Sequence, residues 1–146
     1  MVASCSAISP KTVEVKGKTI KTTAYTHNEK DHTKYKKKNA IGTTLKAGKS
    51  AASDWAIFPV GTVIKIDNKV YEIDDYGSAL INPKEGFPVI DIYQPSIKAM
   101  NVYGAKYHNN IEIIKWGSWE ESANILKDRL QYRQCKLMYD GIQKHL

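Results

Sequence analysis

Three aspartates stand in segments that otherwise consist of apolar and aromatic residues. Asp75 ends the run KVYEIDD, Asp91 lies in PVIDIY, and Asp54 lies in ASDWAIFPVGT. Burying an ionised carboxylate is costly unless it is paired or hydrogen-bonded, so each of the three needs a structural or a chemical reason. Shelter raises the pKa of a carboxyl group and a neighbouring carboxylate raises it further, which suits a general acid near neutral pH. The structural alternative is that these groups cap turns or accept backbone N–H bonds.

The alternation of side chains along a strand gives these carboxylates different surroundings. In KVYEIDDY, Tyr71, Ile73 and Asp75 share one face, and Asp74 lies on the other. The face with Tyr and Ile is the expected inner one, so the pattern predicts a sheltered Asp75 and a solvated Asp74. In PVIDIY both faces are apolar, and Asp91 is therefore partly sheltered in either orientation.

Short β-rich runs separated by Gly, Asn, Asp or Pro occupy most of the chain from residue 19 to residue 116. Their β-branched and aromatic residues are the signature of strands. Asp67-Asn68, between two of the runs, predicts a tight hairpin turn. The segment 95–100 has apolar residues at helical spacing and predicts one short helix among the strands. The five runs are TIKTTAYT, GTVIKID, KVYEIDDY, PVIDIY and NIEIIKW.

The C-terminal segment changes to helical periodicity. Ser118, with Glu121 three residues later, forms a capping box that predicts the start of a helix. Apolar residues then recur at helical spacing, which predicts one amphipathic helix that runs to about residue 139 and packs on the strands. The apolar positions are Trp119, Ala123, Leu126, Leu130 and Leu137.

Positive charge is concentrated in lysine. The net charge is +7, from 20 Lys and 2 Arg against 15 acidic residues. Base-specific readers of nucleic acid favour arginine, whereas a lysine excess fits diffuse attraction to polyanions or plain solubility. Residues 28–51 are polar, lysine-rich and punctuated by Gly, which predicts a long surface loop.

The size and the ends of the chain limit the class of protein. A length of 146 residues suits one domain, and no apolar run approaches the roughly 20 residues that cross a bilayer. The start MVASCSAISP lacks the basic and apolar parts of a secretory signal. Cys5 and Cys135 could form one disulfide, remain free thiols, or, for Cys5 in the run Val-Ala-Ser-Cys, carry a lipid as in bacterial lipoproteins.

The order of the motifs resembles the three-aspartate (3D) domain, found in membrane-bound lytic transglycosylase A and in resuscitation-promoting-factor analogues of Gram-positive bacteria. The segments that carry the resemblance are TTAYT, IGTTLKAG, ASDWAIFPVGTVIKI, YEIDDYGSAL, VIDIYQPS and NVYG. The resemblance implies a mainly β fold, a six-stranded double-psi β-barrel with a short inserted helix and a C-terminal amphipathic helix. The expected organisation is a lead-in at 1–18, the barrel at 19–116 and the helix at 117–146.

The resemblance also assigns the three aspartates. It implies that Asp91 is the catalytic acid, that Asp75 supports it and that Asp54 completes the set. Two departures from the family pattern could reshape the groove. The run after Asp75 is Tyr-Gly-Ser-Ala, where the family has a second glycine and a small residue, and residues 82–86 read as an insertion.

The activity implied is cleavage of the β-1,4 bond between N-acetylmuramic acid and N-acetylglucosamine in peptidoglycan, with closure of a 1,6-anhydro ring. We expect no cofactor and no metal, and a monomer that acts on glycan strands outside the cytoplasm. Aromatic rings could stack on sugars, and neighbours in the same motifs could bind them. The expected substrate-binding residues are Tyr25, Thr26, Tyr76, Gly77, Ser78 and Tyr93.

Three other functions compete with this one. A glycan hydrolase would use Asp75 or Asp54 to activate water against the same bond. A cell-wall binding module would hold glycan without cutting it. A polyanion or nucleic-acid binder would rely on the lysine excess alone.

Overall fold

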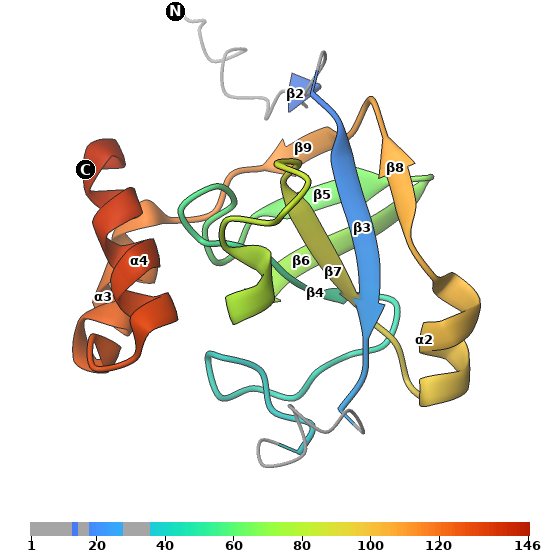
Figure 1. The fold of residues 1–146 in the computed structure, drawn as a ribbon, viewed down its shortest axis with the longest axis horizontal. Helices are drawn as coiled ribbons and strands as arrows, with labels where there is room; N and C mark the ends of the chain where they lie inside the picture. Colours follow the sequence, from blue (N-terminus) through green and yellow to red (C-terminus); the bar gives the residue numbers. More distant parts are fainter. Residues whose placement is uncertain (1–12, 15–17, 28–35) are drawn as a thin grey trace, which may run out of the picture.

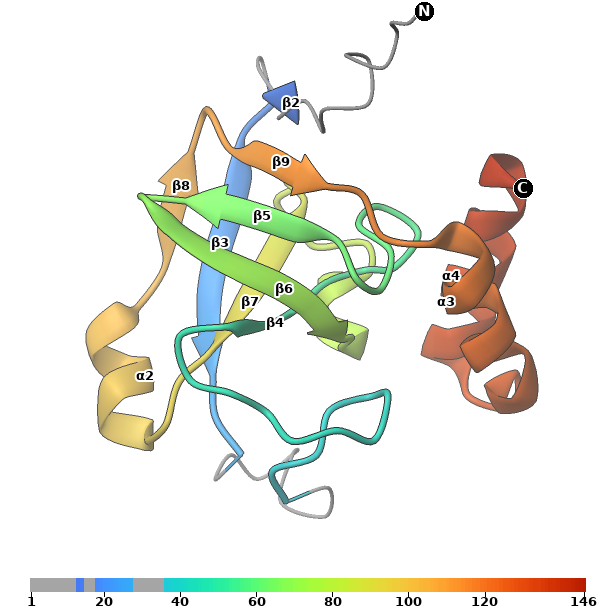
Figure 2. The same cartoon turned by 180° about the vertical axis from the view of Figure 1, so that it is seen from behind.

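The computed structural model describes residues 13–14, 18–27 and 36–146. Within these ranges eight strands form one curled sheet, in the order β2-β9-β5-β6-β4-β7-β3-β8, and α-helices flank it (Figures 1 and 2). The strands are β2 (Val13–Glu14), β3 (Ile20–Tyr25), β4 (Ser50–Ala52), β5 (Val63–Ile66), β6 (Lys69–Asp75), β7 (Val89–Tyr93), β8 (Lys106–His108) and β9 (Glu112–Lys115).

The helices lie on opposite sides of the sheet. The short helix α2 flanks one side, while α3 and α4 lie together at the other (Figure 1). The bounds are α2 (Ile97–Tyr103), α3 (Trp119–Leu126) and α4 (Arg133–Ile142), with 3-10 turns η2 (Ser78–Leu80), η3 (Lys127–Arg129) and η4 (Gln143–His145). The mainly β class is therefore confirmed, and α2 overlaps the segment 95–100 for which the sequence predicts a short helix.

The predicted count of six strands is wrong, because the described residues contain eight. Two of the strands that sequence reasoning missed, β4 and β8, are three residues long. The β4 sequence Ser-Ala-Ala has no β-branched or aromatic residue. It is extended because β6 and β7 both pair with it, which is a tertiary effect that no local propensity reports.

Parallel pairing joins strands that are far apart in the sequence. β3 pairs in parallel with β7, and β4 pairs in parallel with β6. Between these two pairs, β4 runs antiparallel to β7. Parallel neighbours need long crossovers, so the chain must pass over the sheet between them. Among the described residues, the strand pairings form a linear order with β2 and β8 at its two ends. The closure of this sheet into a double-psi barrel stays a prediction.

Isoleucines fill the inner face of the sheet. Ile64, Ile73 and Ile90 are fully buried, and they belong to one continuous apolar cluster. Met138 and Ile142 of α4 join the same cluster. The C-terminal residues therefore pack on the core of the sheet.

The expected single C-terminal helix is two helices. The cap is as predicted: the Ser118 hydroxyl accepts a hydrogen bond from the Glu121 amide at 2.9 Å. The helix then ends at Leu126, and a break at residues 127–132 turns the chain back. Because of this turn, both helices bring buried side chains to the same core, and α4 buries Cys135 and Met138 in place of the predicted Leu137.

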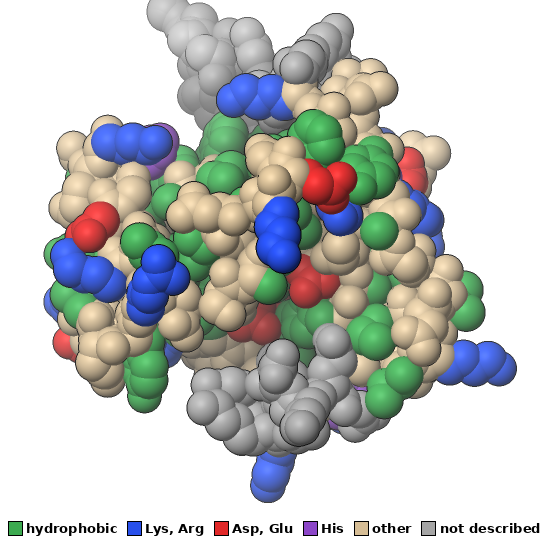
Figure 3. All heavy atoms as spheres, viewed as in Figure 1, with side chains coloured by type: hydrophobic (Ala, Val, Ile, Leu, Met, Phe, Trp, Pro, Cys, Tyr) green, Lys and Arg blue, Asp and Glu red, His purple; other side chains and the backbone are tan. Residues whose placement is uncertain are grey.

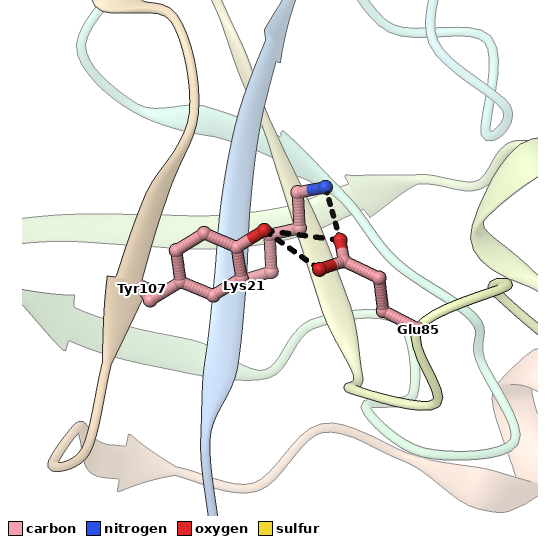
Figure 4. A network of polar contacts seen from close by, with 3 residues as sticks. All are labelled: Lys21, Glu85 and Tyr107. Carbon is pink, nitrogen blue, oxygen red and sulfur yellow. Dashed lines mark hydrogen bonds and ion pairs between the residues drawn. The ribbon is translucent and has the colours of Figure 1, made fainter.

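An exposed polar network holds the segment 82–86 against the sheet. Lys21 of β3 donates to Glu85 at 2.6 Å, and the Tyr107 hydroxyl of β8 donates to the same carboxylate at 2.8 and 3.0 Å (Figure 4). The hydrogen bond from Lys21 lowers the pKa of Glu85. Exposed ion pairs contribute little to the free energy of unfolding. The network instead links the loop that leads into β7 to strands β3 and β8.

Gly117 is a site of close backbone approach. A Cβ atom there would lie 2.1 Å from the Val60 carbonyl oxygen and 2.5 Å from the Thr62 nitrogen. We expect Gly117→Ala to force the backbone apart and to lower the free energy of unfolding by about 2 kcal/mol or more, as measured by urea denaturation. The control is Gly77→Ala, where the φ angle of −152° is extended and the nearest atom lies at 3.6 Å. Equal effects of the two substitutions would contradict this assignment.

Candidate active site

Ala52 stands between two of the three aspartates. On one side β4 pairs Ala52 with Asp75 of β6, and on the other it pairs Ala52 with Asp91 of β7. Residues paired across neighbouring strands point to the same face of a sheet. Two strand spacings separate the two aspartates, so their backbones lie about 10 Å apart. The fold thus brings Asp75 and Asp91 together on one face.

A register shift decides which face that is. Ala51 pairs with Ile73, but the next residue, Ala52, pairs with Asp75, so Asp74 is an extra residue in β6. Bulges of this kind re-aim side chains. Asp75 therefore leaves the inner face of Ile73 and joins the outer one, and the inner-face prediction for Asp75 is wrong. The prediction of a solvated Asp74 is also wrong, because Asp74 is only 9% exposed.

Strand β3 supplies a hydroxyl group to each carboxylate. The Thr23 hydroxyl donates to Asp91 Oδ1 at 2.9 Å, and the Tyr25 hydroxyl donates to Asp75 Oδ2 at 3.0 Å. Thr23 and Tyr25 are two residues apart, so they lie on the same face of β3. One strand therefore orients both acids.

Asp75 is the more deeply buried acid. The residue as a whole is 6% exposed, and its Oδ1 accepts a hydrogen bond from the Tyr76 amide at 3.1 Å. Burial raises the pKa of Asp75 to about 7, although the hydrogen bonds from Tyr25 and Tyr76 act in the opposite direction. Trp55 Nε1 donates to the Asp75 carbonyl oxygen at 2.9 Å and fixes the backbone there.

An apolar cluster separate from the core shelters this outer face. It comprises Tyr25, Leu45, Ala52, Leu80 and Tyr93. Leu45 comes from the loop before β4 and Leu80 from η2, so two connecting segments cover the carboxylates. In the space-filling view, acidic side chains lie near the centre of the face, among apolar ones (Figure 3). Shelter from water is the condition that a raised carboxyl pKa requires.

Asp54 lies in a different environment. Its Oδ1 accepts a hydrogen bond from the Ala56 amide at 2.9 Å, and its carbonyl oxygen accepts from the amides of Ile57 and Phe58. Burial raises the pKa of Asp54, while the charge of Lys144 near the C-terminus opposes this. The structure thus places Asp54 in a turn that faces the C-terminal helices, and its contacts with described residues do not include the other two acids.

Tyr76 faces the C-terminal helices as well. Its hydroxyl accepts hydrogen bonds from Arg129 at 3.2 Å and from the Cys135 thiol at 3.3 Å. Its ring meets Trp55 edge to face at 5.0 Å. Burial raises the pKa of Tyr76 to about 12. Tyr76 therefore connects the C-terminal segment to the part of the chain that directly follows Asp75.

The other predicted substrate-binding residues are distributed around the acids. Tyr93 is buried, meets Tyr25 edge to face at 5.7 Å, and shares a hydrogen bond with His27 Nδ1 at 2.7 Å. Thr26 is fully buried at the end of β3. Gly77 precedes η2, and Ser78, its first residue, is exposed.

Sequence reasoning missed Thr23, His27 and the pair formed by Ser50 and Asp74. The Ser50 hydroxyl donates to Asp74 Oδ2 at 2.6 Å. Thr23 could have been found, because it alternates with Tyr25 in a predicted strand. The role of Ser50 had no such signal, since it follows from the position of β4.

Several expectations fall partly or wholly outside the described residues. Cys5 and the lead-in up to residue 12 are among them, so the lipid-anchor and disulfide hypotheses for Cys5 stay predictions. Cys135 is buried, and no described residue forms a disulfide with it. No three His, Cys, Asp or Glu side chains of the described residues are grouped to hold a metal ion. Among those residues, no helix is long and apolar enough to span a bilayer.

Among the comparisons with known proteins, only the one with solved structures gives matches. No family model and no curated protein matches the chain. Among solved structures, an apo form of a point variant of the E. coli lytic transglycosylase MltA matches with 20% identity and a TM-score of 0.40 over 56% of this chain. A second MltA structure matches with 23% identity and a TM-score of 0.39 over 55% of it.

The matched region covers 28% of the length of each MltA chain. The TM-scores are low, so a function for this chain has to follow from its own residues.

The raised pKa of Asp75 predicts how stability depends on pH. Between about pH 4 and pH 7 the native state holds a proton that the unfolded state has lost, so this group makes stability fall as pH rises. Each pKa unit corresponds to about 1.4 kcal/mol, so the contribution is on the order of a few kcal/mol. We expect Asp75→Asn to flatten this part of the curve of unfolding free energy against pH. The exposed control Asp128→Asn should leave the slope unchanged, and an unchanged slope in Asp75→Asn would refute the assignment.

The hydrogen bond from the Tyr25 hydroxyl lowers the pKa of Asp75, in opposition to burial. Because the Tyr25 hydroxyl stabilises the ionised form of Asp75, Tyr25→Phe should raise the pKa of Asp75 above about 7. Titration of the carboxyl carbon by NMR measures it directly. The control is Tyr107→Phe. It removes a hydroxyl group from β8, the strand that pairs with β3 on the side away from β7. A fall in the Asp75 pKa in Tyr25→Phe would show that the bond does not act as described.

Proposed function

We propose that this chain cleaves the β-1,4 bond between N-acetylmuramic acid and N-acetylglucosamine in peptidoglycan, as a lytic transglycosylase with Asp91 as its acid and base. The observation that carries the proposal is the pairing of a partly exposed Asp91 with a buried Asp75 across Ala52. The order of the motifs, which resembles the three-aspartate domain, supports the choice of substrate.

Asp91 is better suited than Asp75 to meet a substrate. Asp91 keeps part of its surface exposed, whereas Asp75 is 6% exposed and both of its oxygens accept hydrogen bonds. A general acid has to come within hydrogen-bond reach of the reacting oxygen. Thr23 holds Asp91 Oδ1, which orients the carboxyl group.

In the first step, protonated Asp91 gives its proton to the glycosidic oxygen while the bond from C1 to that oxygen breaks. Positive charge develops at C1 and the ring oxygen, as in other glycosidic cleavages. N-acetylglucosamine leaves with the proton as a free alcohol, and Asp91 becomes a carboxylate.

In the second step, the C6 hydroxyl of the muramic acid residue attacks C1. The Asp91 carboxylate takes the hydroxyl proton, and the new bond from O6 to C1 closes the anhydro ring. Asp91 returns to its protonated form and no water is consumed. The nucleophile is tethered to the substrate, so high effective molarity replaces a second catalytic carboxylate.

Asp75 acts in this scheme as a positioning residue. Its bonds to Tyr25 and Tyr76 engage both oxygens, so it has little capacity to activate a water molecule. This disfavours the hydrolase alternative. Asp54 accepts hydrogen bonds from the amides of its own turn at 54–58, and its role in this scheme is to hold that turn. Because peptidoglycan lies outside the cytoplasm, the proposed function implies an extracytoplasmic protein.

The test is mass spectrometry of the soluble products released from purified sacculi. We expect anhydro-ended fragments from the native chain, and a loss of rate of about 10²–10⁴-fold in Asp91→Asn, because the proton donor is removed. The matched control is Asp128→Asn, the same substitution at an exposed aspartate. It should release fragments at the rate of the native chain.

Other outcomes would assign other functions. Fragments with reducing ends would mean that water is the nucleophile and that the chain is a hydrolase. Sacculus binding without any release of fragments would make it a binding module. Undiminished anhydro products from Asp91→Asn would remove Asp91 from its proposed role.

A further inference from the structure

One row of side chains crosses the sheet next to Asp91. Lys21 of β3 pairs with Val89 of β7 on one side and with Tyr107 of β8 on the other, while Thr23 pairs with Asp91 two residues further along. Residues paired across neighbouring strands share a face, so all five side chains lie on the face of the proposed proton donor. Two residues along a strand span about 6.6 Å, so the row of Lys21, Val89 and Tyr107 begins one short step from Asp91.

The face is accessible on the side of this row. The five side chains are half-buried or exposed, whereas Ile90 and Ile92, which point to the opposite face of β7, are buried. Tyr25 and Tyr93, at the other end of the same face, are buried as well. The accessible surface therefore leads from Asp91 toward the row and not toward the buried tyrosines.

The ring of Tyr107 is exposed and yet held in place. The residue is 53% exposed, and its hydroxyl donates to both oxygens of Glu85 at 2.8 and 3.0 Å (Figure 4). Phe87 meets the ring edge to face at 5.9 Å, and Lys21 Nζ lies 5.5 Å from the ring centroid. Single exposed aromatic residues are common, but most keep their rotamer freedom. A ring that is already fixed loses little conformational entropy when a ligand stacks on it.

The polar groups beside the ring carry no net charge. The Lys21 ammonium donates to Glu85 at 2.6 Å, which raises the pKa of Lys21 and lowers the pKa of Glu85, so the pair is ionised at neutral pH. An ammonium group has three donors, so Lys21 can donate to a ligand as well as to Glu85. An ion would be attracted by one member of the pair and repelled by the other. A neutral ligand rich in hydroxyl groups suits both.

We propose that Tyr107, Lys21 and Glu85 form a subsite for a neutral sugar residue of the glycan strand. The C–H groups on one side of a pyranose ring are apolar and weakly positive, so they pack on the negative face of an aromatic ring. The sugar hydroxyl groups donate and accept hydrogen bonds, which matches a carboxylate beside an ammonium group. Tyr107 is the platform, and the charged pair fixes the orientation of the sugar on it.

This inference deepens the proposed function and rests on it for the identity of the sugar. In peptidoglycan the muramic acid residues carry the peptides, so the neutral sugar is N-acetylglucosamine. Glu85 belongs to the segment 82–86, which the sequence indicates as an insertion relative to the three-aspartate pattern. The subsite is therefore a feature of this chain, and its effect is to hold the glycan strand across the face that carries Asp91.

Binding is tested by NMR titration of the native chain with triacetylchitotriose, a neutral β-1,4-linked trimer of N-acetylglucosamine. We expect saturable shifts of the Tyr107 ring signals and of the Glu85 amide signal. Tyr107→Leu should weaken binding about tenfold, as the loss of a central aromatic contact does in other interfaces. The matched control is Tyr132→Leu in the C-terminal segment, because Tyr132 is 52% exposed. It should bind the trimer as the native chain does.

Two further arms separate stacking from charge and from a folding effect. Tyr107→Phe keeps the ring and loses the bonds to Glu85, so its affinity should lie between those of the native chain and Tyr107→Leu. Trigalacturonate, an anionic sugar trimer, should bind more weakly than triacetylchitotriose at equal ionic strength. Tighter binding of the anion would overturn the neutral-sugar assignment. The subsite itself is refuted by a native chain that shows no shifts, or by a Tyr107→Leu variant that binds with native affinity.

Kinetics on soluble glycan strands connect the subsite to the reaction. Tyr107→Leu should raise KM about tenfold and leave kcat unchanged, because a sugar held away from the cleaved bond is bound equally in the ground state and the transition state. Tyr132→Leu should change neither constant. An unchanged KM in Tyr107→Leu would remove the subsite and leave the proposed function standing. If the native chain binds triacetylchitotriose through Tyr107 but cleaves no glycan, the proposed function fails and the sugar site stands.

Discussion

The pairing of β4 with two neighbours is the constraint on which the site depends. This three-residue strand lies between β6 and β7, and its last residue, Ala52, is the partner of both Asp75 and Asp91. One extra residue in β6, at Asp74, sets the register that puts both acids on one face. Without this shift, Asp75 would point into the isoleucine core, where a carboxylate has no donor.

The site balances the cost of burial against a small number of hydrogen bonds. Burial raises the pKa of Asp75, and the hydroxyl of Tyr25 and the amide of Tyr76 limit the rise to about 7. That value places the group between its two protonation states at neutral pH. Connecting segments supply the cover, through Leu45 and Leu80, so the shelter of the acids depends on loops as well as on strands.

The C-terminal helices contribute to the site from a distance. Trp55 donates to the carbonyl oxygen of Asp75, and the same indole packs on the ring of Tyr76. Arg129 and Cys135 donate to the hydroxyl of Tyr76. The helical C-terminal segment therefore does more than cover apolar surface, because Arg129 and Cys135 hold the side chain of Tyr76, the residue next to the buried acid.

The sequence alone determined the strand runs around Asp75 and Asp91, a short helix near residues 95–100 and the cap at Ser118, because these follow from local periodicity and local hydrogen bonding. It also indicated, through the order of its motifs, which aspartates to compare. Only the tertiary structure decided that β4 is a strand, that Asp75 faces outward and that Asp74 is buried. The physical reason is that a strand without β-propensity and a one-residue register shift are set by pairing between segments distant in the chain, and alternation within one segment cannot report either.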